Sequence, residues 1–500
     1  MNYQRAFKKI MAIICLVCVG TLFFRAQESK SEPYDPEKRF TAQELKEDFQ
    51  ILRDALEEGH AGLYRYTSKE RFDELFDSLA SRLNRSLTEA EFLKMLLPLV
   101  ANINDGHTGI MSSDAGGKYF ENQPWFLPFN LRFVAKKAYL FRNYSKNSDV
   151  EMGSELLRIN GNLLSDVVAK ILPLLSSDAH IETSKFRALE STIYFGSLFN
   201  LLYGASMSYT LCIKPPGQDR TKEIKVSGIT AKDANSIFQE RYPEAAKDEP
   251  PIELEYRDDI AILTIRTFAG FSYGRAKIAY KKFMKKTFEE LKEKETKNLI
   301  IDLRDNGGGS DEYGKILFAY LTDKPFQYYA ALETKKNEYA FFKYTGLSPK
   351  RRKLSEKRFR KNERGWYDQL GHPNLGTQEP LQPTYEGQTY ILINGRSFSA
   401  TGESTSVIHY HKKAIFVGEE CGAGYYGNTS GMMPMVTLPH TQIRIAIPLV
   451  RYTMAVSDYP KDRGIVPEYQ VSPTIEDLLQ DRDIVLEFTV DLIRKKSEGS

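Results

Sequence analysis

Cysteine is scarce in this chain of 500 residues. Only four cysteines occur, and Cys15 and Cys18 lie in an N-terminal segment that we expect to be removed. Its removal leaves Cys212 and Cys421, and a disulfide between these two remains open. The sequence contains no paired cysteine cluster and no His-Glu-x-x-His pattern. The zinc sites that such patterns build are therefore excluded.

Other cofactor-binding motifs are also missing from the sequence. No Gly-x-x-x-x-Gly-Lys-Ser/Thr phosphate loop occurs. His409 and His411 are two positions apart, which places them on different sides of a helix. We therefore expect no metal and no organic cofactor. The net charge is only +3, so overall charge gives no reason to expect a nucleic-acid partner.

The chain also lacks an apolar run long enough for an ordinary membrane span. Three basic residues precede an uncharged run at 10–24, which is shorter than the roughly 20 residues that a spanning helix needs. This pattern predicts a signal peptide over residues 1–26, cleaved after Ala26. The residues before Cys15 and Cys18 are bulky, whereas a lipoprotein signal has a small residue there. We expect an exported protein, either secreted or in the periplasm or cell envelope of a Gram-negative bacterium. An uncleaved anchor, the one membrane contact considered, remains open.

What is present indicates several globular domains. The chain is 41% apolar and 27% charged, and its length exceeds the roughly 250–300 residues at which single cores stop growing. Residues 35–115 read as a helical domain, because Thr41-Ala-Gln-Glu44 and Thr88-Glu-Ala-Glu91 are capping boxes that open amphipathic runs. A helical tail is expected over residues 473–500.

Residues 120–230 predict a second unit of short alternating strands. The turn at 153–161, GSELLRING, resembles the corresponding turn of PDZ domains, which bind extended peptide ends by adding a strand to a sheet edge. An apolar insertion at 181–203 interrupts the pattern. The alternative is a purely structural β-rich spacer.

Residues 250–472 form the largest predicted domain. Strand-like runs at 260–265, 298–303, 390–393 and 414–417 alternate with helical runs at 273–291, 311–321 and 400–411. Such alternation predicts parallel strands joined by helices. An insertion at 326–386 breaks the rhythm, and its basic run at 350–364 has a charge that suits nucleic acid or anionic lipid. We interpret it as a solvated loop, because an exported protein seldom meets nucleic acid.

Two strand-to-helix turns in this domain carry candidate chemistry. In the first, the apolar run in NLIIDLRDNGGGS at 298–310 ends in three glycines, which suits a turn with exposed N–H groups. In the second, Ser399 follows a strand and precedes a helix, where the dipole and free N–H groups stabilise negative charge. The alternative for the glycine turn is an ordinary strand-to-helix turn, and the alternative for Ser399 is a simple helix N-cap. His107, just past a helix end, has the same alternative of a simple cap.

In combination these pieces resemble one superfamily, which contains the C-terminal processing (tail-specific) peptidases, the tricorn protease core and the interphotoreceptor retinoid-binding proteins. The matching stretches are LIIDLRDNGGG at 299–309, ILINGRSFSATGE at 391–403, AIFVGEECGAG at 414–424, GIVPEYQV at 464–471 and DGHT at 105–108. The resemblance implies an α/β fold: a Clp-protease/crotonase-like catalytic domain with an N-terminal helical domain and a PDZ-like domain. It also implies serine peptidase activity on peptide or protein substrates.

The resemblance assigns Ser399 as nucleophile. The oxyanion donors it implies are the N–H of Ala400 and that of Gly307 or Gly308. The processing peptidases pair the serine with a lysine, and the matching position here is Gly424. The tricorn-like branch instead uses a histidine from the helical domain.

His107 is therefore the expected general base, with an ordinary pKa that suits the task. For the orienting carboxylate, Asp458 is the best positional match, and Asp462 and Glu468 are rivals. The alternative function is a non-catalytic binding protein on the same fold, with the apolar stretch at 193–203 lining a ligand pocket. A third candidate function is a peptide-binding scaffold that uses only the PDZ-like unit. Oligomeric state stays open.

Overall fold

The computed structural model describes residues 33–147 and 150–498. The predicted signal peptide, residues 1–26, lies outside them. None of the helices in the described residues combines the length and apolar character that crossing a membrane would require. Cys212 and Cys421 are both free thiols, so the disulfide left open by the sequence is not formed.

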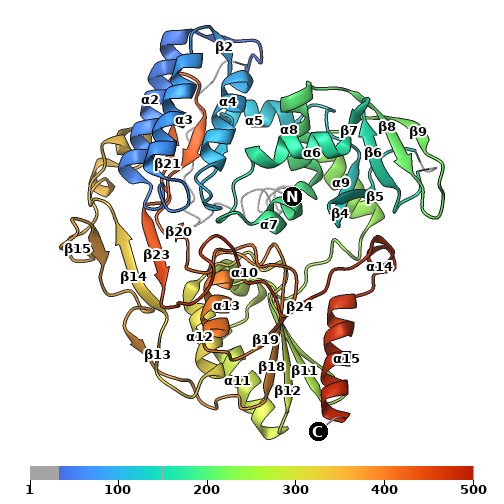
Figure 1. Ribbon diagram of the computed structural model, residues 1–500, viewed down its shortest axis with the longest axis vertical. Helices are drawn as coiled ribbons and strands as arrows, with labels where there is room; N and C mark the ends of the chain where they lie inside the picture. The colour runs from blue at the N-terminus through green and yellow to red at the C-terminus, as the bar shows by residue number, and fades with distance from the viewer. Residues whose placement is uncertain (1–32, 148–149, 499–500) are drawn as a thin grey trace.

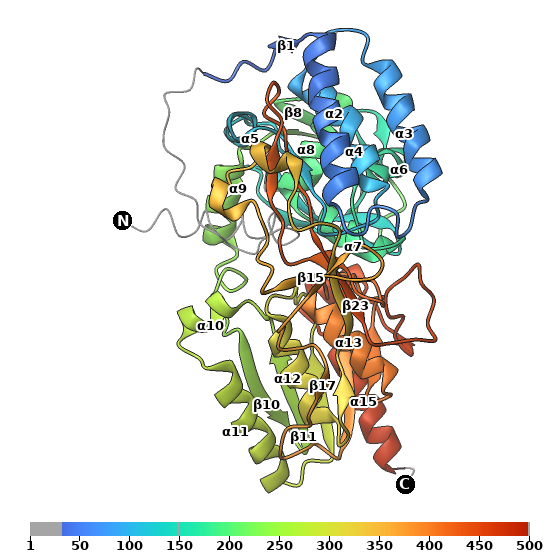
Figure 2. The same ribbon diagram turned by 90° about the vertical axis from the view of Figure 1, so that its left-hand side faces the viewer.

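The helical domain stands at one end of the molecule, shown in blue in Figures 1 and 2. Its helices are α2 (Ala42–Gly59), α3 (Lys69–Arg82), α4 (Glu89–Ala101) and α5 (Asp114–Glu121), with short strands β1 (Arg39–Phe40), β2 (Leu87–Thr88) and β3 (Ile110–Met111). Both capping boxes are confirmed, since Thr41 and Thr88 each accept the predicted backbone N–H and their partners Glu44 and Glu91 bond back.

Segments from late in the chain complete the core of the helical domain. Phe341 and Phe342 of the 3-10 turn η2 (Ala340–Tyr344) pack with the buried faces of α2–α4, and so do side chains of β21 (Met435–Thr437) and β22 (Arg444–Ala446). Strand β22 also pairs with β3. The helical domain is therefore fastened to the C-terminal half by shared apolar burial and a shared sheet.

The second unit contains an antiparallel sheet in the order β4-β5-β6-β8-β9. Its elements are β4 (Phe129–Val134), β5 (Lys137–Asn143), β6 (Glu155–Ile159), β7 (Asn162–Leu163), α6 (Leu164–Ile171), η1 (Leu172–Leu174), α7 (Glu182–Leu189), α8 (Thr192–Tyr203), β8 (Ser208–Lys214), β9 (Lys222–Ser227) and α9 (Ala231–Arg241). Helix α8 buries Phe195, Leu198 and Phe199 in this unit's core. The apolar stretch at 193–203 is thus a core helix. The PDZ likeness stays a prediction.

The α/β domain is built on a six-stranded sheet in the order β10-β11-β12-β18-β19-β24. Its strands are β10 (Ile252–Arg257), β11 (Ile260–Ile265), β12 (Asn298–Asp302), β18 (Gln388–Ile393), β19 (Ile415–Gly418) and β24 (Tyr469–Gln470). Strands β10 and β11 are antiparallel and the other pairs are parallel.

Helices cover both faces of this sheet (Figure 1). On β11, Ala261 and Leu263 pack with α11 (Tyr280–Glu293), α12 (Asp311–Leu321) and α13 (Ala400–Tyr410). Ile260 and Ile262 point to the opposite face and pack with α15 (Ile484–Glu498). This alternation is the period of two that a strand imposes, and it explains why the central strands are apolar throughout. The short helix α14 (Ile475–Leu479) precedes α15.

The helix predicted over 273–291 is wrong as a single element. It is divided into α10 (Gly270–Ala276) and α11. Lys277 ends α10 in the left-handed region, at φ 56°, and donates its N–H back to Tyr273 and Gly274. A left-handed residue of this kind ends a helix. Because Lys277 is not a glycine, the sequence carries no sign that the helix ends there.

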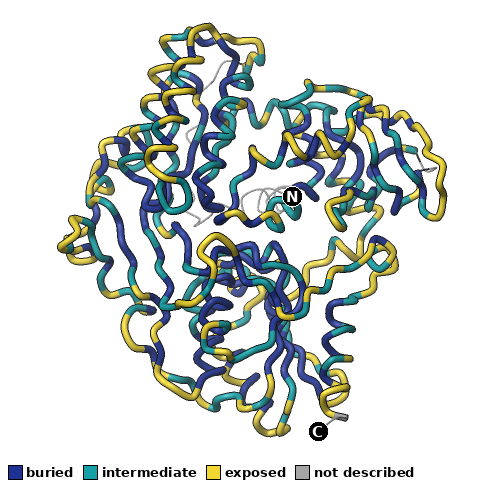
Figure 3. The backbone as a smooth tube through the Cα atoms, viewed as in Figure 1, coloured by how far each residue is buried: buried dark blue, intermediate teal, exposed yellow. Residues whose placement is uncertain are grey.

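The insertion at 326–386 contributes a second sheet, in the order β15-β16-β14-β23-β20, which lies at the side of the molecule (Figure 1). The strands are β14 (Tyr329–Thr334), β15 (Phe359–Lys361), β16 (Tyr367–Gln369), β20 (Thr429–Ser430) and β23 (Val450–Met454); β13 (Phe326–Gln327) pairs with β17 (Thr377–Gln378), and η3 (Pro349–Arg351) lies in the basic run. Most of that run is exposed, in yellow beside β15 in Figure 3. The exposure of the basic run agrees with its interpretation as a solvated loop. The insertion as a whole also supplies ordered strands.

Candidate active site

Ser399 stands in a strained turn between β18 and α13. Its backbone has φ 56° and ψ −128°, a conformation that is uncommon for a residue with a side chain. Its side chain makes no capping hydrogen bond, so the simple N-cap interpretation is wrong. Two residues earlier, the Ser397 hydroxyl donates to the carbonyl of Leu303 at 2.8 Å and joins this turn to the end of β12. The turn therefore presents a partly exposed hydroxyl on a fixed backbone.

His107 meets Ser399 although 292 positions separate them in sequence. The His107 Nε2 atom lies 3.0 Å from Ser399 Oγ, which is hydrogen-bonding distance for a base and its nucleophile. The ring of Phe398 stacks on the imidazole with centroids 4.6 Å apart. Burial lowers the pKa of His107, while the negative charge of Asp105 acts in the opposite direction. The ring is therefore held neutral and ready to accept a proton.

Two buried carboxylates accompany the histidine. Asp105, His107 and Asp178 bring one side-chain atom each within 4.8 Å of one another. Asp105 Oδ1 accepts the His107 backbone N–H at 2.9 Å. Asp178 accepts the N–H of Gly106 at 2.8 Å and that of Gly424 at 3.1 Å. Burial, and then the charge of Asp105, raise the pKa of Asp178 to about 7.

A directed hydrogen-bond chain holds Asp105 from the other side. The Gly62 N–H donates to His60 Nδ1 at 3.0 Å, so the proton of the neutral His60 ring is on Nε2. His60 Nε2 then donates to Thr108 Oγ1 at 2.6 Å, and Thr108 donates to Asp105 Oδ1 at 3.1 Å. His60 is fully buried and burial lowers its pKa to about 4, which keeps the ring neutral and the chain pointed towards the carboxylate.

Asp458, the carboxylate expected to orient His107, lies on the surface of the protein. Asp458 is exposed and its carboxylate accepts a hydrogen bond from the neighbouring Ser457 at 2.7 Å. Its rivals are exposed too, and Glu468 Oε2 accepts the Phe416 N–H of the central sheet at 2.8 Å. The structure gathers Asp105 and Asp178 around His107 instead of Asp458 or Asp462. Counting positions along the chain cannot reveal that this loop faces solvent.

The glycine turn lies directly against Ser399. A Cβ atom on Gly308 would stand 2.7 Å from Ser399 Cβ and 2.8 Å from the Ala400 nitrogen, and φ is +93° at this glycine. The Gly308 N–H is donated to Asn306 Oδ1 at 3.0 Å. The Gly307 N–H makes no hydrogen bond within the part of the chain that the structure describes. The Ala400 N–H belongs to the first residue of α13, where no intrahelical acceptor exists. The Gly308 N–H is therefore already occupied, whereas no hydrogen bond of the described residues takes up the N–H of Ala400.

Gly424 shows how the site manages without a lysine. Its N–H holds Asp178, and a Cβ atom at this position would stand 2.9 Å from the hydroxyl of Tyr66. A lysine side chain has no room there unless Tyr66 shifts. The backbone amide of this residue instead supports the carboxylate cluster beside His107.

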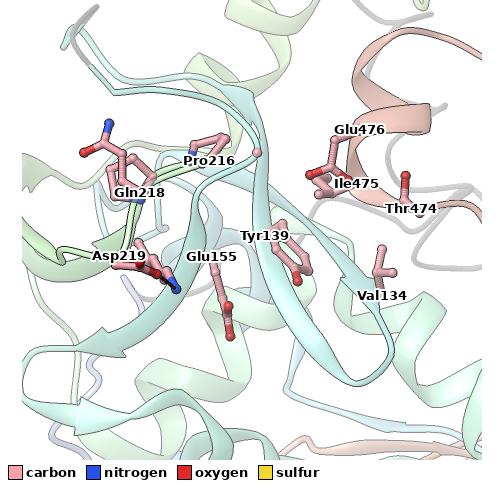
Figure 4. Close-up of a pocket in the computed structure, with 13 residues that line it drawn as sticks. Val134, Tyr139, Glu155, Pro216, Gln218, Asp219, Thr474, Ile475 and Glu476 are labelled. Carbon is pink, nitrogen blue, oxygen red and sulfur yellow. Dashed lines mark hydrogen bonds and ion pairs between the residues drawn. The ribbon is translucent and has the colours of Figure 1, made fainter.

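A pocket lies away from these residues, beside the second unit (Figure 4). It has a volume of about 530 Å³ and opens between the antiparallel sheet of the second unit and α14, with Tyr139, Glu155, Pro216 and Ile475 among its lining residues. None of the site residues described above lines it. The site is recognised by the geometry of its side chains and not by pocket size.

Sequence reasoning missed three of the residues gathered here. Asp105 lies inside the quoted DGHT motif and a signal was present, since it is two positions from the base. Asp178 and His60 gave none: Asp178 lies in the second unit and His60 at the end of α2. Their proximity to His107 arises only when three separate segments fold together.

Comparison with known proteins shows what the chain is similar to. Residues 259–471 match the family model described as peptidase family S41. The crystal structure of mature CPAF is 16% identical, covers 88% of this chain and 94% of its own, and superposes with a TM-score of 0.55. Mature CPAF complexed with lactacystin is also 16% identical, with coverages of 91% and 98% and a TM-score of 0.59. No curated protein sequence matches the chain.

Proposed function

This chain belongs to peptidase family S41, and from that premise we propose that Ser399 is its nucleophile and His107 its general base. The chain is a serine peptidase, a hydrolase that acts on peptides or proteins. The observation that carries the assignment of the base is the distance of 3.0 Å between His107 Nε2 and Ser399 Oγ.

In this proposal the reaction begins when Ser399 Oγ attacks the carbonyl carbon of a peptide bond. Its proton passes to His107 Nε2, and the negative charge on the former carbonyl oxygen is held by the N–H groups of Ala400 and Gly307. Each such donor typically contributes about 3–4 kcal/mol towards the barrier. The tetrahedral intermediate collapses, His107 gives the proton to the leaving amine, and an acyl-enzyme remains. Water, deprotonated by His107, then hydrolyses the ester.

The carboxylate role passes from Asp458 to Asp105 in this mechanism. Asp105 is buried beside His107, and its negative charge favours the imidazolium that forms during attack. The hydrogen bond from the His107 backbone fixes the carboxylate relative to the ring. Asp178 braces the same turn through Gly106.

We further propose that the protein acts outside the cytoplasm, in the periplasm or as a secreted enzyme. Support comes from the sequence alone: basic residues before an uncharged run and a short polar stretch after it. Mass spectrometry of the mature protein from its host would test this. A new N-terminus at Gln27 supports export, and an intact N-terminus in the cytoplasmic fraction contradicts it.

The assignment of Ser399 and His107 is tested with a fluorophosphonate probe and intact mass spectrometry. The wild type should gain one adduct, which peptide mapping places on Ser399, and Ser399→Ala should gain none. His107→Ala should react about 10²–10⁴-fold more slowly, the range that a general base contributes. His440→Ala is the matched control, because His440 binds Glu47 in the helical domain and its loss should leave the rate unchanged. A folded wild type that takes no label would refute the proposal.

A further inference from the structure

Two buried acids stand behind the nucleophile and the base. Glu403 lies one turn into α13, where its backbone N–H donates to the carbonyl of Ser399 at 2.9 Å. Asp105 lies two positions before His107 and accepts its backbone N–H at 2.9 Å. Any displacement of either acid therefore moves the catalytic residue attached to it. Glu403 belongs to the α/β domain and Asp105 to the helical domain.

Consecutive residues at the start of β20 connect these two acids. Asn428 Nδ2 donates to Glu403 Oε1 at 2.8 Å. The hydroxyl of Thr429 donates to Asp105 Oδ2. Neighbouring side chains on extended backbone point in opposite directions, so one residue reaches each domain. We call this pair of residues the 428–429 link.

The link is held firmly in place. Asn428 is 3% exposed and Thr429 is fully buried. Ser430 Oγ donates to Asn428 Oδ1 at 2.8 Å, which leaves the amide nitrogen turned towards Glu403. The backbone is tied to β23, because Thr429 pairs with Arg451 and the Tyr452 N–H donates to the Asn428 carbonyl at 2.9 Å. The link is thus a short rigid bridge with both ends hydrogen-bonded.

We propose that Asn428 and Thr429 are positioning residues that set the separation of Ser399 from His107. The inference rests on the proposed function. A displacement of about 1 Å in a site of this kind can cost roughly a hundredfold in rate. The nucleophile and the base come from different domains. The distance between them must therefore be held to within about 1 Å across a domain boundary. The 428–429 link crosses the boundary through two side chains that touch neither the substrate nor the reacting atoms.

The test compares labelling kinetics of the fluorophosphonate probe across variants. Thr429→Val removes the hydroxyl and keeps the volume, and Asn428→Leu removes the amide donor. Each should lower the labelling rate at saturating probe by roughly 10–100-fold. The probe concentration that gives half of the maximal rate should change less than about twofold, since positioning affects attack more than binding. Thr429→Ser keeps the donor and should restore most of the rate.

A matched control is available far from the site. Thr441 donates its hydroxyl to the buried Asp48 at 2.6 Å, so Thr441→Val removes the same kind of bond in the helical domain. It should lower the melting temperature and leave the labelling rate at saturating probe unchanged. All rates are measured per folded protein and below the melting temperature of each variant. If Thr429→Val does not fold, Asn428→Leu against Thr429→Ser decides the question.

A double variant adds a second criterion. If both residues act through one link, Thr429→Val combined with Asn428→Leu should slow labelling by much less than the product of the two single effects. The inference is overturned if the folded single variants label as fast as the wild type, if Thr441→Val slows labelling equally, or if the two effects multiply. A wild type that labels while link variants are unaffected refutes only this inference. A wild type that takes no label refutes the proposed function and this inference with it.

Discussion

Replacing Glu403 with glutamine should stabilise the protein at neutral and alkaline pH. The reason lies in a proton count at Tyr329. Its hydroxyl oxygen lies 2.8 Å from Asp311 Oδ2 and 2.7 Å from Glu403 Oε2. A phenol has one proton to donate, so one of the two carboxyl groups must carry a proton of its own and donate it to Tyr329. Burial raises the pKa of Tyr329 well above its ordinary range, so the phenol keeps its proton.

Glu403 is the group that carries the extra proton. Burial, and then the charge of Asp311, raise its pKa from the ordinary 4.5 to about 7. The folded protein therefore binds this proton more tightly than the unfolded chain does. The stability contributed by the protonated group is complete below pH 4.5 and is lost as the pH rises to about 7. This rise in the pKa of Glu403 corresponds to about 3 kcal/mol in the free energy of unfolding.

The assay is urea unfolding of the wild type and Glu403→Gln at intervals from pH 5 to pH 8. Glutamine is neutral at every pH, and its amide can donate to Tyr329 as the protonated acid does. The free energy of unfolding of the variant minus that of the wild type should grow by about 2–3 kcal/mol between pH 5 and pH 8. Parallel curves for the two proteins would refute the reasoning, because they would mean that Glu403 is ionised in the folded state throughout.

Three further predictions concern the site itself. Gly308→Ala should abolish labelling of Ser399, because the new Cβ would stand 2.7 Å from that residue's own Cβ; Gly217→Ala, at φ +68° with nothing within 4 Å, controls for backbone strain alone, and equal losses in both would contradict the steric argument. The pKa of Asp178 is raised to about 7, so above that pH its charge favours the protonated His107. The rate of the wild type divided by that of Asp178→Asn should therefore be severalfold larger at pH 8 than at pH 6, and a constant ratio would mean that the charge of Asp178 plays no part. Dialysis against a chelator should leave the labelling rate unchanged; a loss that zinc or another divalent ion restores would instead assign the carboxylate–histidine cluster to a metal.

The sequence predicted those parts of the site that are written in contiguous segments. The glycine turn, Ser399 and His107 each belong to a short motif, and a family resemblance joined motifs that lie hundreds of positions apart. The assignment of the carboxylate to Asp458 came from a count of positions, which carries no information on burial, and Asp458 lies in an exposed loop. Asp178 has no motif, since backbone N–H groups hold it and these leave no trace in residue identity. The same limit explains the helix break at Lys277, where the left-handed backbone carries no glycine.

At the level of the fold, the alternation of strands and helices was sufficient to predict the α/β domain, and the capping boxes to predict α2 and α4. It was not sufficient to predict that the 326–386 insertion would form a sheet with β20 and β23. Three strands of this sheet, β15, β16 and β20, have only two or three residues each, so they carry no periodic signal. Their position depends on partners from distant parts of the chain.

The separation of the catalytic residues along the chain has a consequence for biosynthesis. In the proposed mechanism the base is at position 107 and the nucleophile at 399, and the 428–429 link lies later still. A nascent chain that has made only the helical domain and the second unit holds the proposed base but lacks Ser399. It also lacks the late segments η2, β21 and β22, which complete the core of the helical domain. The competent arrangement can form only once residues beyond 430 have left the ribosome or the export channel. In the proposed mechanism, a nascent chain that ends before the 428–429 link is therefore inert.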